Sequence, residues 1–212
     1  MERKEISKSV LKRLPIYLGY LKSLPKGTAT YISATALANA LGMGEVQVRK
    51  DLAQVSDGGR PKIGYLRESL IEDINQFLGY DNTTDAVLVG AGKLGQALLG
   101  YSGFDDYGLN ILAAFDVSIK TSKTVDGKPL LPMDELKDYC HDNKILMGII
   151  TVPAASAQQV CDRMIDSGIK AIWNFAPVHL DVPDHILVQN ENMATSLAVL
   201  SMHLQAQMKE KK

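Results

Sequence analysis

The chain has 212 residues, of which 46% are hydrophobic and 22% charged, values typical of ordinary globular proteins with one or two domains. No run approaches the roughly 18 consecutive apolar residues that span a bilayer, and the polar start lacks the apolar stretch of a secretory signal. The net charge is −1, but residues 1–62 hold 11 Lys or Arg against 5 Asp or Glu, and this basic segment favours contact with a polyanion.

The first predicted element is a helix. Four leucines recur at spacings of three and four, the pattern of an apolar helix face: Leu11, Leu14, Leu18 and Leu21. Pro15 interrupts this pattern, and proline is tolerated only in the first turn of a helix. We therefore expect the helix to begin near Lys12.

Two further helices form a helix-turn-helix pattern. Ser33 is a suitable N-cap for a helix over residues 34–41, and a glycine-containing turn leads to a third helix from about residue 45 to 54. Burial of Val48, Leu52 and Val55 would leave the polar side chains of that helix free. An exposed helix of this kind fits the major groove of DNA, where Gln and Arg reach base edges.

Residues 58–65 are predicted to form a tight hairpin with Arg60 and Lys62 near its tip. A helix-turn-helix followed by a basic hairpin is the winged-helix layout, and the two cations suit phosphates or the minor groove. The alternative is a small helical cap whose charges are simply solvated.

The rest of the chain alternates strands and helices, which predicts a doubly wound parallel sheet. A linker helix over 67–78 and a polar loop over 79–84 precede it. The expected strands are 85–89, 111–115, 144–152, 171–175 and 186–188, and the expected helices are 96–101, 154–167 and a last one from residue 192. The last helix carries an apolar stripe that packs either on its own core or on a partner subunit.

A glycine motif follows the first of these strands. Gly90 permits a tight turn, Gly92 lets the backbone approach a pyrophosphate, and Gly95 lets the next helix pack on the sheet. Asp116 ends the second strand, where a carboxylate accepts hydrogen bonds from ribose hydroxyls and repels a 2′-phosphate. The sequence therefore favours NAD(H) over NADP(H); the alternative is a similar sheet with an empty crevice.

No catalytic or metal-binding set is evident. Tyr101 lies beside the glycine motif without a lysine at helical spacing, and His179 follows a strand but reads as a loop residue. Cys140 and Cys161 lack C-x-x-C spacing and are expected to be buried thiols. These observations predict a reduced, cytoplasmic, metal-free protein, and cofactor binding without catalytic groups indicates a sensor.

Six stretches in order resemble the Rex family, bacterial repressors that read the NADH/NAD⁺ balance. They cover nearly the whole chain from about Lys12 to Leu204 and are residues 13–18, 47–52, 89–98, 113–116, 150–154 and 174–178. The resemblance implies a homodimer that binds a near-palindromic, double-stranded DNA operator. It also implies that NADH releases the protein from DNA, whereas NAD⁺ competes for the site and permits DNA binding.

We accordingly predict an α/β fold in three parts. An N-terminal winged helix-turn-helix DNA-binding domain spans residues 1–80, a Rossmann-type doubly wound parallel sheet binds NAD(H) over 81–191, and a C-terminal dimerisation helix over 192–212 is exchanged between subunits. The expected cofactor contacts are Gly90, Ala91, Gly92, Lys93, Leu94, Gly95, Asp116, Val117, Thr151, Val152, Pro153, Asn174 and Phe175. The expected DNA contacts are Arg13, Gln47, Arg49, Lys50, Arg60 and Lys62.

The chain departs from the family pattern at two places. Members often pair an Arg of the first helix with an Asp early in the last helix, but the matching positions hold Gly19 and Asn192. The predicted hairpin over residues 58–65 also differs from the Phe-Gly form that is commoner in the family. Two rival functions stay open: an NAD-dependent oxidoreductase with a helical appendage, and a DNA-binding regulator that responds to another nucleotide or only to its partner subunit.

Overall fold

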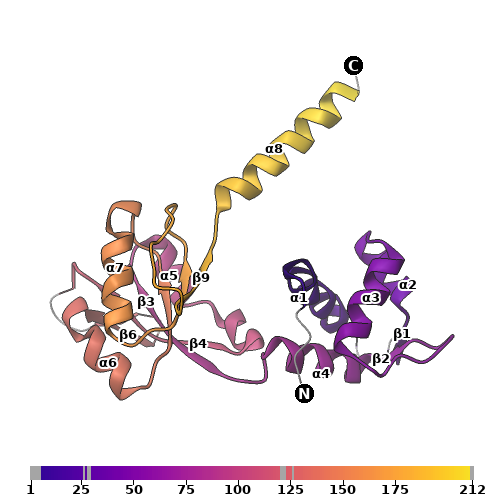
Figure 1. Ribbon diagram of the computed structural model, residues 1–212, viewed down its shortest axis with the longest axis horizontal. Helices are drawn as coiled ribbons and strands as arrows, with labels where there is room; N and C mark the ends of the chain where they lie inside the picture. Colours follow the sequence, from indigo (N-terminus) through magenta and orange to yellow (C-terminus); the bar gives the residue numbers. More distant parts are fainter. Residues whose placement is uncertain (1–5, 26, 28–29, 120–122, 126, 211–212) are drawn as a thin grey trace. The chain divides into compact units, whose positions relative to one another are not determined.

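The computed structural model describes residues 6–25, 27, 30–119, 123–125 and 127–210 (Figure 1). The chain divides into two compact units, Met1–Asn82 and Thr83–Lys212. The division falls within the polar loop that precedes the first strand of the large sheet, and each unit has a hydrophobic core of its own.

The N-terminal unit consists of four helices and a two-stranded sheet. Its elements are α1 (Lys8–Ser23), β1 (Tyr31–Ile32), α2 (Ala34–Leu41), α3 (Glu45–Val55), β2 (Tyr65–Leu66) and α4 (Arg67–Leu78). The predicted helix-turn-helix is confirmed: the Ser33 hydroxyl accepts a hydrogen bond from the Ala36 N–H at 3.0 Å, and Gly42 ends α2 in the left-handed conformation. Val48 and Leu52 of α3 are fully buried, whereas Val55 is only partly buried.

The predicted start of α1 is wrong. The helix begins at Lys8, where the Ser7 side chain caps the Val10 N–H, so Pro15 lies in the interior of the helix. Proline lacks the N–H that would bond to the carbonyl four residues earlier, which costs about 3 kcal/mol in a helix. Burial of Leu14, Tyr17, Leu18 and Leu21 on one face offsets this cost because each large apolar side chain contributes about 1.5–3 kcal/mol.

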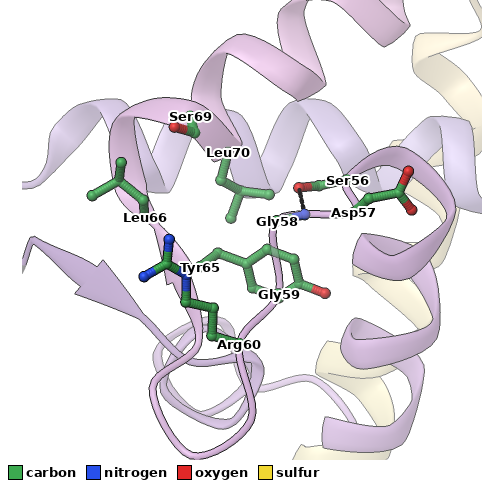
Figure 2. Close-up of a pocket in the computed structure, with 9 residues that line it drawn as sticks. All are labelled: Ser56, Asp57, Gly58, Gly59, Arg60, Tyr65, Leu66, Ser69 and Leu70. Atoms are coloured by element: carbon green, nitrogen blue, oxygen red, sulfur yellow. Dashed lines mark hydrogen bonds between the residues drawn. The ribbon is translucent and has the colours of Figure 1, made fainter.

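The wing (residues 58–65) is smaller than the predicted hairpin. Its two arms share one antiparallel bridge, between Arg60 and Gly64, and β2 then pairs with β1 rather than with the other arm. Figure 2 shows the base of the wing, where Ser56 Oγ accepts from the Gly58 N–H at 3.2 Å and the Tyr65 ring lies against Gly59. Contact with the Tyr65 ring therefore stabilises the short turn, in place of a long series of hydrogen bonds between two strands.

The C-terminal unit contains a seven-stranded sheet in the order β5-β6-β4-β3-β7-β8-β9. All neighbouring strands are parallel except β5 and β6, which form an antiparallel pair at one edge. The strands are β3 (Thr84–Val89), β4 (Leu109–Asp116), β5 (Lys123–Val125), β6 (Lys128–Pro132), β7 (Met147–Ile150), β8 (Ala171–Asn174) and β9 (Leu187–Asn190). The predicted doubly wound sheet is confirmed.

Helices cover both faces of this sheet, and the alternation along β3 explains why. Val87 and Val89 face a core formed with α6 (Leu136–Asp142) and α7 (Ala154–Asp166), whereas Ala86 and Leu88 face a second core that includes Leu99 of α5 (Lys93–Leu99). Figure 1 labels these three helices beside the strands of the sheet. Two short 3₁₀ helices, η1 (Ser102–Tyr107) and η2 (Met133–Glu135), connect the layers. The sequence reasoning missed β5, β6, α6 and both 3₁₀ helices.

The last helix, α8 (Met193–Glu210), leaves its apolar stripe exposed. The described members of the stripe are 56–66% exposed: Leu197, Leu200, Leu204 and Met208. The alternative that this stripe packs on the core of its own unit is therefore wrong. Within the described residues, no helix combines the length and apolarity needed to cross a bilayer.

Candidate functional site

The first candidate site is a crevice at the carboxyl ends of the central strands. The strand order switches between β3 and β7: β4 lies on one side of β3, and the chain later returns to add β7 on the other side. Ligands bind at such switch points in open α/β sheets. A cavity of about 770 Å³ opens there, which is large enough for part of a dinucleotide. Its lining residues are Val89, Gly90, Gly92, Asp116, Val117, Met133, Thr151, Val152, Pro153, Ser156, Gln159, Val160 and Arg163.

The glycine turn at this crevice is held in place from both sides. The Gly90 N–H donates to the Phe115 carbonyl at 2.8 Å, and the Thr151 hydroxyl donates to the Gly90 carbonyl at 2.7 Å. Gly95 lies so close that a Cβ there would meet the Gly90 oxygen at 1.8 Å. Gly95 is thus required by packing between helix and turn, as the motif predicts.

Gly92 is different because none of the residues that the structure describes requires a glycine there. Its backbone is extended, with φ −69° and ψ −173°, and a Cβ would have no heavy atom within 4 Å. The open space above Gly92 belongs to the crevice that it lines. A glycine that the protein itself does not need leaves room for a ligand to approach the backbone.

Asp116 lines the same crevice at the end of β4. Its carboxylate accepts hydrogen bonds from the Ala91 N–H at 2.7 Å, the Ser118 N–H at 2.8 Å and the Ser118 hydroxyl at 2.7 Å. Burial opposes ionisation, but these three hydrogen bonds outweigh it and hold the pKa of Asp116 below its ordinary value. The stability that Asp116 contributes is present above its ordinary pKa and is lost as the pH falls through the lowered pKa.

The predicted cofactor residues do not all line the cavity. Gly90, Gly92, Asp116 and Val117 do so together with Thr151, Val152 and Pro153. Asn174 is instead fully buried, and its amide binds the backbone of Ala176 and Val178 and the side chain of Asn190. Asn174 therefore shapes the loop after β8.

The sequence reasoning missed the cavity face of α7. Ser156, Gln159, Val160 and Arg163 follow one another at spacings of three, one and three, which places them on a single helix face. Arg163 Nη2 donates to the Met133 carbonyl at 2.8 Å and to Asp134 Oδ1 at 3.2 Å. The sequence already contains this helical spacing. A helix that follows a strand at the switch point is expected to line the crevice, so these residues could have been predicted.

The second candidate site is the outer surface of α3 and the wing. Gln47, Arg49 and Lys50 are all exposed on α3, and Arg49 pairs with Glu45 one turn away. A separate hollow of about 490 Å³ is lined by Arg49, Arg60, Lys62, Tyr65 and the first residues of α2. Three cationic side chains thus line one recess, and their positive charge attracts the phosphates of a nucleic acid.

Arg13, which was predicted to contact DNA, pairs with α3 and leaves 19% of its side chain exposed. Its Nε donates to Asp51 Oδ2 at 2.7 Å and its Nη2 to Asp51 Oδ1 at 2.9 Å, while Asp51 itself is only 2% exposed. The Tyr17 hydroxyl donates to the same carboxylate at 2.8 Å. Burial, together with that hydrogen bond, raises the pKa of Tyr17 to about 12, so the hydroxyl remains a donor.

Other reactive side chains in the described segments form no site. Cys140 and Cys161 are free and buried, and burial raises the pKa of each thiol to about 11, which makes both inert. Over the described part of the chain, no group of three or more His, Cys, Asp or Glu side chains could hold a metal ion. Tyr101 is 54% exposed and makes an edge contact with Phe104.

Two family models match the chain. One, described as a CoA binding domain, matches residues 81–178, and the other, described as "Putative DNA-binding protein N-terminus", matches residues 5–53. The chain is 40% identical over 193 residues to the redox-sensing transcriptional repressor Rex of Treponema denticola, with 91% of this chain and 92% of that protein covered. It is also 40% identical over 200 residues to Rex of Clostridium beijerinckii, with 94% and 95% covered.

Solved structures of a Rex-family repressor called RSP share the fold. RSP in complex with β-NAD⁺ and operator DNA matches with a TM-score of 0.89 at 33% identity, over 98% of this chain and 96% of that one. RSP in complex with β-NADH matches with a TM-score of 0.86 at 33% identity, over 99% and 100%. The likeness extends over both units.

Proposed function

Because this chain belongs to the Rex family of redox-sensing transcriptional repressors, we propose that it binds operator DNA as a homodimer and that NADH releases it. It is a regulator and not an enzyme, since its relatives are named as repressors. A repressor acts where the chromosome lies, so we assign it to the cytoplasm. Residues 1–80 would bind DNA, 81–191 the cofactor, and 192–212 a second subunit.

The observation that carries the cofactor half of this proposal is the turn at Gly92. A Cβ there would meet no described atom within 4 Å, so the described fold does not account for the glycine, whereas a pyrophosphate against the backbone would. Thr151, Val152 and Pro153 line the same cavity, and Phe175 follows the carboxyl end of β8. We propose that NAD⁺ and NADH occupy one site in this crevice.

The release step requires that NADH bind the released form of the dimer more tightly than the DNA-bound form. A ligand with equal affinity for both forms would shift nothing. Burial of the uncharged reduced nicotinamide between subunits, which disfavours the charged NAD⁺ ring, supplies such a difference. The test is operator binding measured across NADH/NAD⁺ ratios at a fixed salt concentration; binding that does not vary with the ratio rejects the sensing role.

The DNA half of the proposal rests on charge and exposure. Gln47, Arg49 and Lys50 are presented on α3, and Arg60 and Lys62 flank the recess beside it. Arg and Gln carry the hydrogen-bonding groups that read base edges, and the wing cations suit phosphates. We propose that α3 enters the major groove and that a two-fold dimer places two such helices on a near-palindromic operator.

Replacement of Asp116 by Ala is expected to weaken NADH binding about five- to tenfold, because the loss of one charged acceptor for ribose hydroxyls costs about 1 kcal/mol or more. Fluorescence titration of NADH measures this. Ser118→Ala is the matched control, since it removes one support of the carboxylate but leaves the acceptor, and we expect a smaller effect. Equal NADH affinity in wild type and Asp116→Ala would remove Asp116 from the cofactor site.

Replacement of Leu200 by Asp is expected to yield monomers. Leu200 is 66% exposed, and together with the other apolar side chains of α8 it is the surface that we propose for dimerisation. Sedimentation velocity measures the assembly, and operator affinity should fall more than tenfold because a monomer reaches one half-site only. Lys209→Asp, which introduces an acidic charge at a polar position of the same helix, should remain dimeric. A dimeric Leu200→Asp protein contradicts the assignment.

A further inference from the structure

The side chain of Gln47 lies next to the Arg13–Asp51 pair. With the amide oriented so that its oxygen faces α1, that oxygen accepts a hydrogen bond from Arg13 Nη1 at 2.8 Å and lies 3.0 Å from Arg13 Nε, whose single N–H it shares with Asp51. The opposite orientation would set the NH₂ group of Gln47 against a guanidinium, where both groups only donate. The arginine therefore decides which way the amide turns.

Arg13 is itself held rigidly. Asp51 fixes two nitrogens of the guanidinium in a bidentate pair, and the Tyr17 hydroxyl fixes the carboxylate. The pair joins α1 to α3, because Arg13 and Tyr17 belong to the first helix and Asp51 to the third. The planar guanidinium leaves its third nitrogen directed at Gln47, which a lysine ammonium would not do.

We propose that Arg13 is a positioning residue that fixes Gln47 as a hydrogen-bond donor toward operator DNA. This inference rests on the proposed function, because it takes α3 as the helix that reads the major groove. The hydrogen bond from Arg13 Nη1 holds the Gln47 oxygen toward α1, and the neighbouring cation favours the oxygen over the NH₂ group on that side. The NH₂ group of Gln47 lies on the other side of the amide, and it is the group that we expect to contact a base.

A donor-only glutamine has a different base preference from a free one. A free Gln binds adenine through two hydrogen bonds, accepting from N6 and donating to N7. With its oxygen occupied, Gln47 loses the first of these bonds and donates to acceptors such as guanine N7 and O6 or thymine O4. Arg13 thus acts on the choice of base at one operator position without touching it.

The experiment uses the full-length dimer and operator DNA with all four base pairs placed in turn at each half-site position. The position read by Gln47 is the one at which Gln47→Ala abolishes base preference. At that position, Arg13→Lys keeps a cation beside Asp51 but releases the amide, and we expect the preference to move toward adenine by about fivefold or more. Each preference is a ratio of affinities for the same protein, so partial unfolding of a variant does not alter it.

Two controls separate positioning from other roles. Tyr17→Phe removes a support of Asp51 without freeing Gln47, so it should keep the wild-type base preference. The double variant Arg13→Gln with Asp51→Asn removes both charges and should keep the wild-type salt dependence of binding. A fall of about 0.9 in the slope of log affinity against log salt would identify Arg13 as a phosphate contact and overturn the proposal.

The outcomes distinguish this inference from the proposed function. Wild-type protein that binds no operator rejects the function itself. Wild-type protein that binds operator while Arg13→Lys retains the same base preference at every position rejects only the role of Arg13.

Discussion

Replacement of Gly92 by Ala is expected to lower NADH affinity about tenfold to a hundredfold while leaving the folded protein intact. The added methyl group has no atom within 4 Å among the described residues, and the backbone conformation of Gly92 suits any residue, so we expect no folding penalty. A methyl group against a bound pyrophosphate does create overpacking, at about 1–3 kcal/mol. Energy transfer from Trp173, the one tryptophan of the chain, to bound NADH measures the affinity.

Gly95→Ala provides the contrast, because its Cβ would lie 1.8 Å from the Gly90 oxygen. We expect this variant to lose both NADH binding and thermal stability, since the helix must move away from the turn. Unfolding without cofactor distinguishes the two glycines: the melting temperature should fall for Gly95→Ala only. If Gly92→Ala binds NADH as wild type does, no dinucleotide phosphate approaches that turn.

Replacement of Arg49 by Ala is expected to weaken operator binding about fivefold to a hundredfold and to relax specificity at one base position. NADH affinity should stay unchanged, because Arg49 belongs to the N-terminal unit and the crevice to the other. A mobility-shift assay with operator and with unrelated DNA separates the two effects. Lys50→Ala is also expected to weaken operator binding; unaltered affinity in both variants contradicts the placement of α3 in the groove.

Glu45→Gln is the matched control for Arg49. In the free protein Arg49 pairs with Glu45, an exposed contact between neighbouring turns that contributes no more than about 0.5 kcal/mol. Its removal frees Arg49 and takes a negative charge away from DNA phosphates, so operator affinity should rise slightly. Operator affinity is thus expected to fall in Arg49→Ala and to rise in Glu45→Gln. A general disturbance of α3 would lower the affinity in both variants.

Local signals predicted most of the elements correctly. The Ser33 cap, the turn at Gly42 and the strand before Gly90 each depend on a few adjacent residues, and the helix Arg67–Leu78 was predicted with its observed bounds. The failures have physical causes. Pro15 argues against a helix locally, but the buried face of α1 outweighs it, and β5 and β6 are too short to show a period.

The sequence by itself determined the class of the fold, the glycine turn, Asp116 and the exposed face of α3, because each follows from periodicity or spacing over fewer than about thirty residues. Only the tertiary structure decided that α7 lines the crevice, that Gly92 faces open space, and that Arg13 binds Asp51. Arg13 and Asp51 are 38 residues apart, and the angle at which α1 packs into the core of the N-terminal unit brings them together. That angle depends on the whole core of the N-terminal unit, which no local pattern encodes.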